Sequence, residues 1–444
     1  PSSDEARGRY HRAFVRELES QLRHGGRNGA RAAEAQEPSA QELSTTLYSA
    51  TLRLDASGRP TFSLKRPRVN THMKRCFHRF GSDRFLFVDV PNEGISEGHL
   101  EPFTLCGRRF VFALPKRTMS SLKHLKAQNG PPMPAGYGSV VAIFFAESGP
   151  GLDTCRADQF RSWHLPLDLA CARGMTVSKY AERFRLALSD ADRTLEVQAG
   201  EIEVADDFKG CRGRPNTDGN GLGSAQLFEK IAECLGCPGR RISAVQMRLG
   251  PAKGMLVRCD RLSKHVLLFA EQVKYGDQSY YATCEPCQRT IEVCSNGVVF
   301  ADEEHRHPSR LNSQLILVLQ AVGCPAQVFL DLDERLRQSI ESVMLSTTQL
   351  VQSDFLPNAD VADGHSSSDL CFQIHAMHAA GMDHRTDNYL FLCVRRYIQT
   401  QLQKAREDGH LPCPDSYSLT MISDFSRALR PATMSVWMKG RGFV

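Results

Sequence analysis

Short runs in which hydrophobic and polar residues alternate fill much of the first two-thirds of the chain, and this alternation predicts β-strands. Residues 46–55 and 60–69 predict two strands joined by a tight turn at Asp-Ala-Ser-Gly. Further strands are predicted at 84–90, 108–114, 139–146, 243–250, 255–260, 265–276, 289–295 and 297–300.

A helical spacing of apolar residues takes over at a few places, mostly beyond residue 310. Residues 176–188 predict an amphipathic helix with Thr176 as its N-cap, and residues 225–236 predict one that ends at Gly236. Longer helices are predicted at 311–323, 326–345 and 388–406. The chain therefore predicts an α+β protein whose strands come before most of its helices.

These changes in pattern divide the chain into five predicted segments. The first, 1–45, has no sustained apolar period and is predicted to be a disordered or frayed tail. The others are a mixed region at 46–200, a strand-rich region at 201–310, a helical region at 311–410 with a polar loop at 352–369, and a return to strands at 411–444.

Composition narrows the class of protein. With 41% hydrophobic and 24% charged residues, the chain is typical of a globular protein. It has no apolar run long enough to span a bilayer and no apolar signal core, so we expect an intracellular protein that does not bind membranes. The 15 irregularly spaced cysteines are expected to be reduced thiols. The first residue is Pro1, which suggests a fragment of a longer protein.

Two basic stretches, 65–84 and 108–126, contain many Lys, Arg and His residues interleaved with Phe. Such stretches suit a phosphate backbone and its bases. A solvated basic face would have the same composition, so the charge pattern alone leaves both interpretations open.

Three segments stand out along the chain: TDGNGLGS (217–224), SAVQMRLGPAKGMLV (243–257) and LNSQLILVLQAVGCPAQVFLDL (311–332). Their order is typical of the eukaryotic, cell-encoded RNA-dependent RNA polymerases of RNA silencing, and the chain resembles the N-terminal half of that family. Weaker matches lie at 66–88, 179–197 and 414–429.

The resemblance implies a fold and an activity. The family's catalytic core is a pair of double-psi β-barrels, and residues 46–200 would form an N-terminal slab ahead of the first barrel at 201–310, with 311–410 as its helical connector. The implied reaction is nucleotidyl transfer that copies single-stranded RNA into double-stranded RNA from ribonucleoside triphosphates. Silencing-pathway proteins would be further partners, in the nucleus or the cytoplasm.

Site residues follow from the same resemblance. Lys253 and Arg248 are the candidate catalytic residues, because Lys and Arg can neutralise the charge that develops during nucleotidyl transfer. The candidate contacts to RNA are Arg289, Lys65, Arg66, Arg68, Lys74 and Arg75. The candidate turn residues are Asp218, Gly219, Gly221, Gly250 and Gly254, where Gly250 or Gly254 would let the backbone approach a phosphate.

The sequence also departs from the family pattern. The family's Asp-x-Asp-Gly-Asp loop, whose carboxylates bind Mg²⁺, is absent, so the Mg²⁺ of the full-length enzyme is expected to bind residues outside this chain and the chain alone is expected to be inactive. Asp331/Asp333/Glu334 lie in a helical pattern, where residues i and i+2 face apart, and Asp360/Asp363 lie in a Ser-rich loop without the Gly-Asp ending. Residues 285–291 replace a basic strand, Leu222 replaces a Lys and Pro251 a Gly. A catalytically inactive RNA-binding paralogue is therefore the alternative.

Two cysteine pairs suggest a third, unrelated reading. Cys234/Cys237 and Cys284/Cys287 each have the C-x-x-C spacing of structural zinc sites. The pairs lie far apart in a sequence that does not resemble a zinc ribbon, so reduced thiols are the preferred interpretation. His365, His375, His378 and His384 are spaced irregularly and are expected to be solvated rather than metal ligands.

Overall fold

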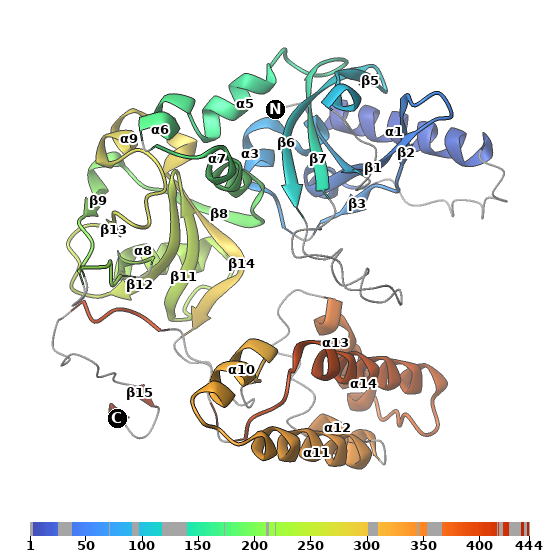
Figure 1. Cartoon of the computed structure of the whole chain (residues 1–444), viewed down its shortest axis with the longest axis vertical. Coiled ribbons are helices and arrows are strands. Elements are labelled where there is room, and N and C mark those ends of the chain that lie inside the picture. Colours follow the sequence, from blue (N-terminus) through green and yellow to red (C-terminus); the bar gives the residue numbers. More distant parts are fainter. Residues whose placement is uncertain are drawn as a thin grey trace. The chain divides into compact units, whose positions relative to one another are not determined.

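The computed structural model describes the chain in several stretches, which fall into two units. The described residues are 3–24, 38–70, 72–90, 97–117, 140–172, 174–209, 213–217, 219–300, 310–343, 346–352, 366–414, 416, 421–425, 437–438 and 442–443. The first unit comprises residues 1–300 and 423–444, and the second comprises 301–422 (Figure 1). No helix in these stretches is both long and apolar enough to cross a membrane.

The first unit begins with a seven-stranded sheet in the order β2-β1-β4-β7-β6-β5, with β3 also paired to β1. All neighbours are antiparallel except β1 and β4. The strands are β1 (Thr46–Leu54), β2 (Pro60–Leu64), β3 (Arg68–Val69), β4 (Phe85–Val90), β5 (Phe103–Leu105), β6 (Arg108–Arg117) and β7 (Val140–Ser148). The strand pair predicted around the Asp-Ala-Ser-Gly turn is confirmed. β1 pairs antiparallel with β2, with Ala50 opposite Leu64 and Leu54 opposite Pro60.

Both faces of this sheet are buried, as the continuous apolar sequence of β7 requires. Ile143 and Phe145 pack on one side, and Phe144 and Ala146 pack on the other, because successive side chains of a strand point to opposite faces. The first side is covered by α3 (Arg75–Phe80), α5 (Ala157–His164), α6 (Leu167–Ala172) and α7 (Val177–Phe184).

The second side is covered by α1 (Asp4–His24), so these residues are helical where a disordered or frayed tail was predicted, and residues 25–37 of that segment lie outside the described residues. Tyr10, Phe14 and Leu18 recur every fourth residue and are buried in the core of the sheet. Arg108, itself buried, stacks on the Tyr10 ring and forms an ion pair with Asp83. A second helix, α2 (Ala40–Thr45), leads into β1 from a capping box at Ser39.

The second sheet of the first unit has the order β8-β14-β11-β12-β10-β13-β9. Its strands are β8 (Ala191–Glu196), β9 (Ile202–Ala205), β10 (Asn220–Ser224), β11 (Ile242–Leu249), β12 (Ala252–Cys259), β13 (Val266–Phe269) and β14 (Thr290–Phe300). Two pairs, β10 with β12 and β13 with β9, are parallel within an otherwise antiparallel sheet. The strands predicted separately at 289–295 and 297–300 form the single strand β14, whose pairing to β11 is irregular between them.

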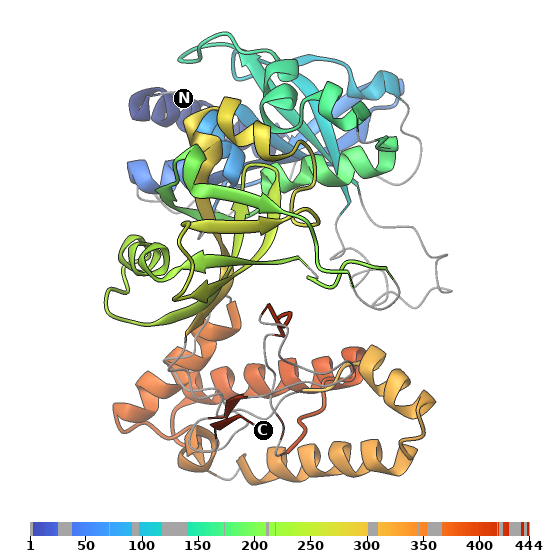
Figure 2. The same cartoon turned by 90° about the vertical axis from the view of Figure 1, so that its left-hand side faces the viewer.

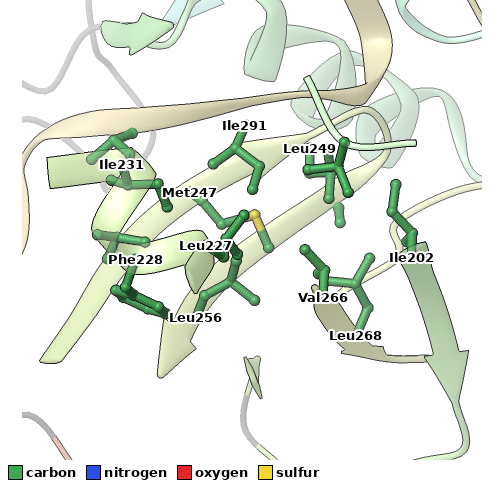
Figure 3. Packing of buried hydrophobic residues seen from close by; sticks show 14 of the residues in the cluster. Ile202, Leu227, Phe228, Ile231, Met247, Leu249, Leu256, Val266, Leu268 and Ile291 are labelled. Atoms are coloured by element: carbon green, nitrogen blue, oxygen red, sulfur yellow. The ribbon is translucent and has the colours of Figure 1, made fainter. Parts of the chain in front are cut away.

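Helix α8 (Ala225–Cys234) closes the apolar side of this curled sheet. Ser224 caps its N-terminus, and Gly236 follows it in a left-handed conformation, as predicted. Leu227, Phe228 and Ile231 pack onto Met247 and Leu256 of the central hairpin (Figure 3). Helix α9 (Gln278–Thr283) precedes β14, and short 3₁₀ helices lie at Ser82–Arg84, Glu97–Leu100, Arg185–Leu188, Ala199–Glu201 and Pro286–Arg289.

The segment after the second unit returns to the second sheet. Phe425 stacks on Phe269 with ring centroids 5.5 Å apart, and the Ser423 hydroxyl donates to the Asn216 carbonyl. A short ladder between β15 (Trp437–Met438) and β16 (Gly442–Phe443) is the remaining strand pair described near the C-terminus.

The second unit is helical (Figure 2). Its helices are α10 (Ser313–Ala321), α11 (Ala326–Val343), α12 (Thr347–Gln352), α13 (Ser366–Ala379) and α14 (Asn388–Asp408). Their shared core includes Leu336, Leu350, Ile374 and Leu390. The helices predicted at 311–323, 326–345 and 388–406 are confirmed, whereas most of the predicted polar loop 352–369 lies outside the described residues.

Candidate phosphate-binding site

The β11–β12 hairpin carries the motif residues, and its alternation decides which of them reach the surface. Val245, Met247 and Leu249 of β11 point into the core. Arg248 pairs with Lys253, and Gln246 pairs with Met255, so these four side chains share the opposite face. A period of two in the sequence therefore presents a polar face at the centre of the sheet.

An open pocket of about 290 Å³ lies on this face. Its lining residues are Arg183, Gly219, Gln246, Lys253, Gly254, Met255 and Lys274. Three of them are cations and none is a carboxylate, so the pocket is suited to an anion.

Lys253 is half-buried and forms no ion pair with any described residue. Burial lowers the pKa of its ammonium group, and the neighbouring Arg248 and Arg183 charges lower it further. The lysine that the sequence singles out thus lies in the pocket, where a negatively charged ligand would stabilise its charge.

Sequence reasoning missed the other two cations of the pocket. Arg183 comes from the C-terminal turn of α7, and its Nε is buried without a hydrogen-bond acceptor in the described structure. Lys274 follows β13 and donates to the Glu271 carbonyl. Burial, followed by the Arg183 charge, lowers the pKa of Lys274. Residues 265–276 were predicted as one strand, but β13 ends at Phe269 and the chain then turns Lys274 into the pocket.

Glycine is required where the wall of the pocket is formed by two backbone segments. Gly254 has φ 157°, and a Cβ there would overlap the Gly219 carbonyl oxygen, which accepts a hydrogen bond from the Met255 amide at 3.0 Å. A Cβ at Gly221 would overlap the side chain of Gln272. These contacts explain why Gly221 and Gly254 are glycines, and Gly219 has a φ of 73°, which favours glycine. Asp218 lies outside the described residues.

Gln272 is a second residue that the sequence did not reveal. It is fully buried, its Nε2 donates to the Met255 carbonyl at 3.1 Å, and its Oε1 accepts from the Phe269 amide. Its own carbonyl accepts from the Lys253 amide at 3.0 Å. Gln272 therefore ties the strand of Lys253 to the turn of Lys274.

Arg248 does not reach the pocket. It is 7% exposed, its Nη1 donates to the adjacent Met247 carbonyl, and its Nε is buried without an acceptor. Burial lowers the pKa of its guanidinium group. On the neighbouring strand β14, Glu292 is the residue directly opposite Arg248. Arg248, the second candidate catalytic residue, is therefore not among the residues that line the pocket.

The turn at Gly250 is also closed. Gly250 and Pro251 are buried, and a Cβ at Gly250 would approach the Gln288 carbonyl and the Tyr280 ring at 3.1 Å. Of the two glycines expected to let the backbone approach a phosphate, Gly254 therefore lines the pocket, whereas Gly250 packs against the Gln288 carbonyl and the Tyr280 ring.

Burial likewise corrects the predicted RNA contacts of Lys74 and Arg75. Lys74 is 5% exposed and forms an ion pair with Asp190 at 2.8 Å, and Arg75 is 3% exposed and pairs with Glu292. Burial opposes the charge of Arg75, but the Glu292 carboxylate raises its pKa overall. Both residues join the first sheet to the second, so neither presents its charge to a template.

The remaining candidate contacts lie apart from the pocket. Arg289 donates to the carbonyls of Tyr281 and Cys284 and lies 3.5 Å from Glu196, so its charge is used within the protein. Lys65 pairs with Asp89, and Arg66 and Arg68 are exposed in and beside β3. The last three remain predictions as template contacts.

The described stretches contain no group of three or more His, Cys, Asp or Glu side chains that could hold a metal ion. Asp333 pairs with Arg337 on α11, and Asp360, Asp363 and His365 lie outside the described residues. Cys234 is exposed on α8, while Cys284 and Cys287 flank the start of a 3₁₀ helix.

Comparisons with known proteins converge on one family. The model of the RNA dependent RNA polymerase family matches residues 59–439. The probable RNA-dependent RNA polymerase 1 of Oryza sativa subsp. japonica is 24% identical over 258 residues, which are 57% of this chain and 31% of that protein. The solved RNA dependent RNA polymerase QDE-1 from Thielavia terrestris matches with a TM-score of 0.60 at 20% identity, over 86% of this chain and 45% of that one. The chain spans less than half the length of either protein.

Proposed function

Because this chain belongs to the RNA dependent RNA polymerase family, we propose that the protein carrying it is an RNA-directed RNA polymerase of RNA silencing. It would copy single-stranded RNA into double-stranded RNA from ribonucleoside triphosphates. The observation that supports this proposal most is the cationic pocket on β12, which lies within the segment that the family model matches.

Lys253 is the residue we assign to substrate contact. Nucleotidyl transfer depends on positioning and on neutralising the charge of the phosphates, and a lysine held in a partly dehydrated pocket does both. The Gln272 carbonyl accepts a hydrogen bond from the Lys253 amide, and Gly254 lets the next residue of β12 lie directly against the Gly219 carbonyl. Both contacts hold the Lys253 backbone in place. Arg248, which is buried and lies opposite Lys253 on the neighbouring strand, has no such role in this proposal.

We also propose that the second sheet is the first double-psi β-barrel of the polymerase core. The parallel pairs β10–β12 and β13–β9 join strands that are not consecutive in the chain, within an otherwise antiparallel sheet, and this arrangement supports such a barrel. In this proposal the helical unit is the connector of the barrel. Divalent metal chemistry is general in the family, and the Mg²⁺ would be held by carboxylates other than those described here. Protein partners from the silencing pathway would follow from the family alone.

The second candidate function is a non-catalytic RNA-binding paralogue. The altered strand at 285–291 supports it, because Arg289, the one basic residue there, donates to the carbonyls of Tyr281 and Cys284 and forms an ion pair with Glu196. Such a protein would bind RNA with strong salt dependence without polymerising nucleotides.

One experiment separates the two functions. The protein expressed from its full-length transcript is incubated with single-stranded RNA, Mg²⁺ and the four ribonucleoside triphosphates, and the product is digested with a nuclease specific for double-stranded RNA. Template-dependent product supports the polymerase. Salt-dependent RNA binding without product would favour the paralogue.

A further inference from the structure

One edge strand of each sheet in the first unit is bonded to a glutamine side chain from a neighbouring helix. β2 lies at one end of the first sheet, and β9 lies at one end of the second. An edge strand presents backbone N–H and C=O groups that can pair with another chain. In both strands, two of these groups form hydrogen bonds with a glutamine instead.

At β2 the glutamine is Gln21 of α1, the helix that runs beside this strand (Figure 1). Its Nε2 donates to the Phe62 carbonyl at 3.2 Å, and its Oε1 accepts from the Leu64 amide at 3.0 Å. Pro60, at the start of the strand, has no N–H to offer. Residues 61–64 carry no charged side chain, so this edge lacks the charges that commonly oppose strand pairing, and Gln21 supplies the barrier.

At β9 the same pair of bonds comes from Gln278 of α9. Its Nε2 donates to the Ile202 carbonyl at 3.0 Å, and its Oε1 accepts from the Val204 amide at 2.7 Å. The Ile202 amide itself donates to the Ala199 carbonyl. Both glutamines therefore use a donor and an acceptor like those of a peptide group to occupy an edge.

The spacing of these bonds is that of a parallel ladder. Each glutamine bridges the carbonyl of one residue and the N–H of the residue two positions further along, from Phe62 to Leu64 and from Ile202 to Val204. A residue of a parallel neighbouring strand makes the same two bonds. Two glutamines from unrelated elements thus each take the place of one residue of a further strand.

The opposite edges of the two sheets are protected in other ways. β5 is three residues long, and a very short strand offers little to pair with. β8 is bonded to the segment before α3, because the Ala191 amide donates to the Met73 carbonyl and Asp190 forms a bridge with Lys74. Among the described strands, β2 and β9 are therefore the edges that depend on a glutamine.

We propose that Gln21 and Gln278 are caps that prevent two copies of this chain from joining their sheets edge to edge. A second copy is the expected partner, because two identical edges offer each other the same donors and acceptors about a twofold axis. α1 is anchored in the core by Phe14, so Gln21 competes with a strand from another molecule as an intramolecular partner, at high effective concentration. Neither glutamine lines the pocket on β12, so the proposal does not depend on the polymerase reaction.

Sedimentation velocity of the 444-residue chain over a series of concentrations tests this proposal with Gln21→Met and Gln278→Met. Methionine resembles glutamine in length and helix propensity, but it has no N–H and only a weak acceptor. We expect each variant to self-associate about tenfold more tightly than the wild type, because a second copy can form the hydrogen bonds that the cap no longer occupies. Gln399→Met, at an exposed position of α14, is the matched control and should associate as the wild type does.

Hydrogen exchange shows whether the association uses the edges. In dilute Gln21→Met the Leu64 amide should exchange faster than in the wild type, and in dilute Gln278→Met the Val204 amide should do so. Each amide should become protected as its variant associates. The two substitutions act on separate edges, so Gln278→Met tests the proposal even if Gln21→Met loosens α1.

Equal self-association of both variants, the control and the wild type would overturn the proposal. Association that leaves the Leu64 and Val204 amides unprotected would overturn it as well, since the copies would then meet through another surface.

Discussion

At the scale of single residues, the site depends on positions where a few atoms decide the geometry. Gly254 allows β12 to approach the backbone of Gly219, and Gln272 holds the two lysine-bearing segments together. Lys253 could be predicted because it lies in a motif. Arg183 and Lys274 could not, because a charged residue on an amphipathic helix or after a strand has the pattern of a solvated residue. Only the tertiary fold brings them beside Lys253.

Gly254→Ala tests the close approach. The new Cβ would overlap the Gly219 carbonyl oxygen, and the φ of 157° is already unfavourable for a side chain. Gly239→Ala is the matched control, because Gly239 has φ 83° with open space around it. We expect Gly254→Ala to lower the free energy of unfolding by about 1–3 kcal/mol more than the control does. Chemical denaturation measures both, and equal losses would show that the overlap is absent.

The ion pair between Arg75 and Glu292 joins the two sheets of the first unit. Glu292→Gln would leave the buried Arg75 without its counter-charge, next to the buried Arg248. We expect a loss of about 3–5 kcal/mol in the free energy of unfolding. Glu285→Gln removes the partner of Arg79 in an exposed pair and should cost less than about 1 kcal/mol. Similar small losses in both variants would contradict the packing described for Arg75.

At the scale of elements, the sequence predicted the strands and helices in which apolar residues recur regularly and charged residues stay on the other face. The β11–β12 hairpin and α8, α11 and α14 belong to this class. Helix α1 was missed because Arg and Glu dominate its composition, although its apolar residues recur every fourth position. Short helices such as α3 and α9 were missed because six residues give too little periodicity to recognise.

Phe14→Ala tests whether α1 is part of the core. Phe14 is fully buried between the helix and the first sheet. Its loss should lower the free energy of unfolding by about 3–5 kcal/mol, since it removes apolar contacts and leaves a cavity. Leu22→Ala, at a position that is 42% exposed on the same helix, should change it by less than about 0.5 kcal/mol. A negligible effect of Phe14→Ala in denaturant unfolding would restore the prediction of a disordered tail.

His164 connects α5 to α7 and gives a pH dependence to this contact. Its Nε2 lies 3.1 Å from the Arg183 carbonyl, and burial, with a smaller effect of the Arg75 charge, lowers its pKa to about 3. Between the unfolded pKa of about 6.5 and this value, the unfolded chain binds a proton that the folded chain does not. Stability should therefore fall as pH decreases, with this residue contributing up to about 1.4 kcal/mol per pH unit.

His164→Gln retains a donor for the Arg183 carbonyl and cannot be protonated in this range. Urea unfolding between about pH 4 and pH 7 should show a smaller decrease in stability for this variant than for the wild type, because carboxylates contribute equally to both. Parallel curves for the two proteins would show that His164 is accessible to protons in the folded state.

At the scale of the whole molecule, the chain leaves its β-rich unit after Phe300, forms a helical unit and returns at Ser423. Each unit has its own core, so each is expected to unfold in its own transition. Leu390→Ala should lower the melting temperature of one calorimetric transition, and Leu249→Ala should lower that of the other. Each substitution should decrease the free energy of unfolding of its own unit by about 2–5 kcal/mol. A single transition lowered by both variants would mean that the units unfold together.

The sequence predicted the strand–helix organisation and the family, but the boundaries of its five segments remain predictions. The first unit comprises two sheets that share buried ion pairs, and no local pattern could show that Arg75 would meet Glu292 across 217 residues. Residues 65–84 therefore looked like an RNA-binding stretch, when the charges of Lys74 and Arg75 serve the packing of one sheet on the other.

We propose that this chain supplies the substrate pocket of a polymerase. Nucleotide incorporation by the Lys253→Ala variant of the full-length protein tests this proposal. Incorporation on a single-stranded RNA template and affinity for that RNA are measured side by side, with Lys230→Ala, on the exposed face of α8, as the control. The account predicts that Lys253→Ala lowers incorporation about tenfold or more while RNA affinity changes little. Equal losses of incorporation and RNA affinity, or no loss of either, would contradict it.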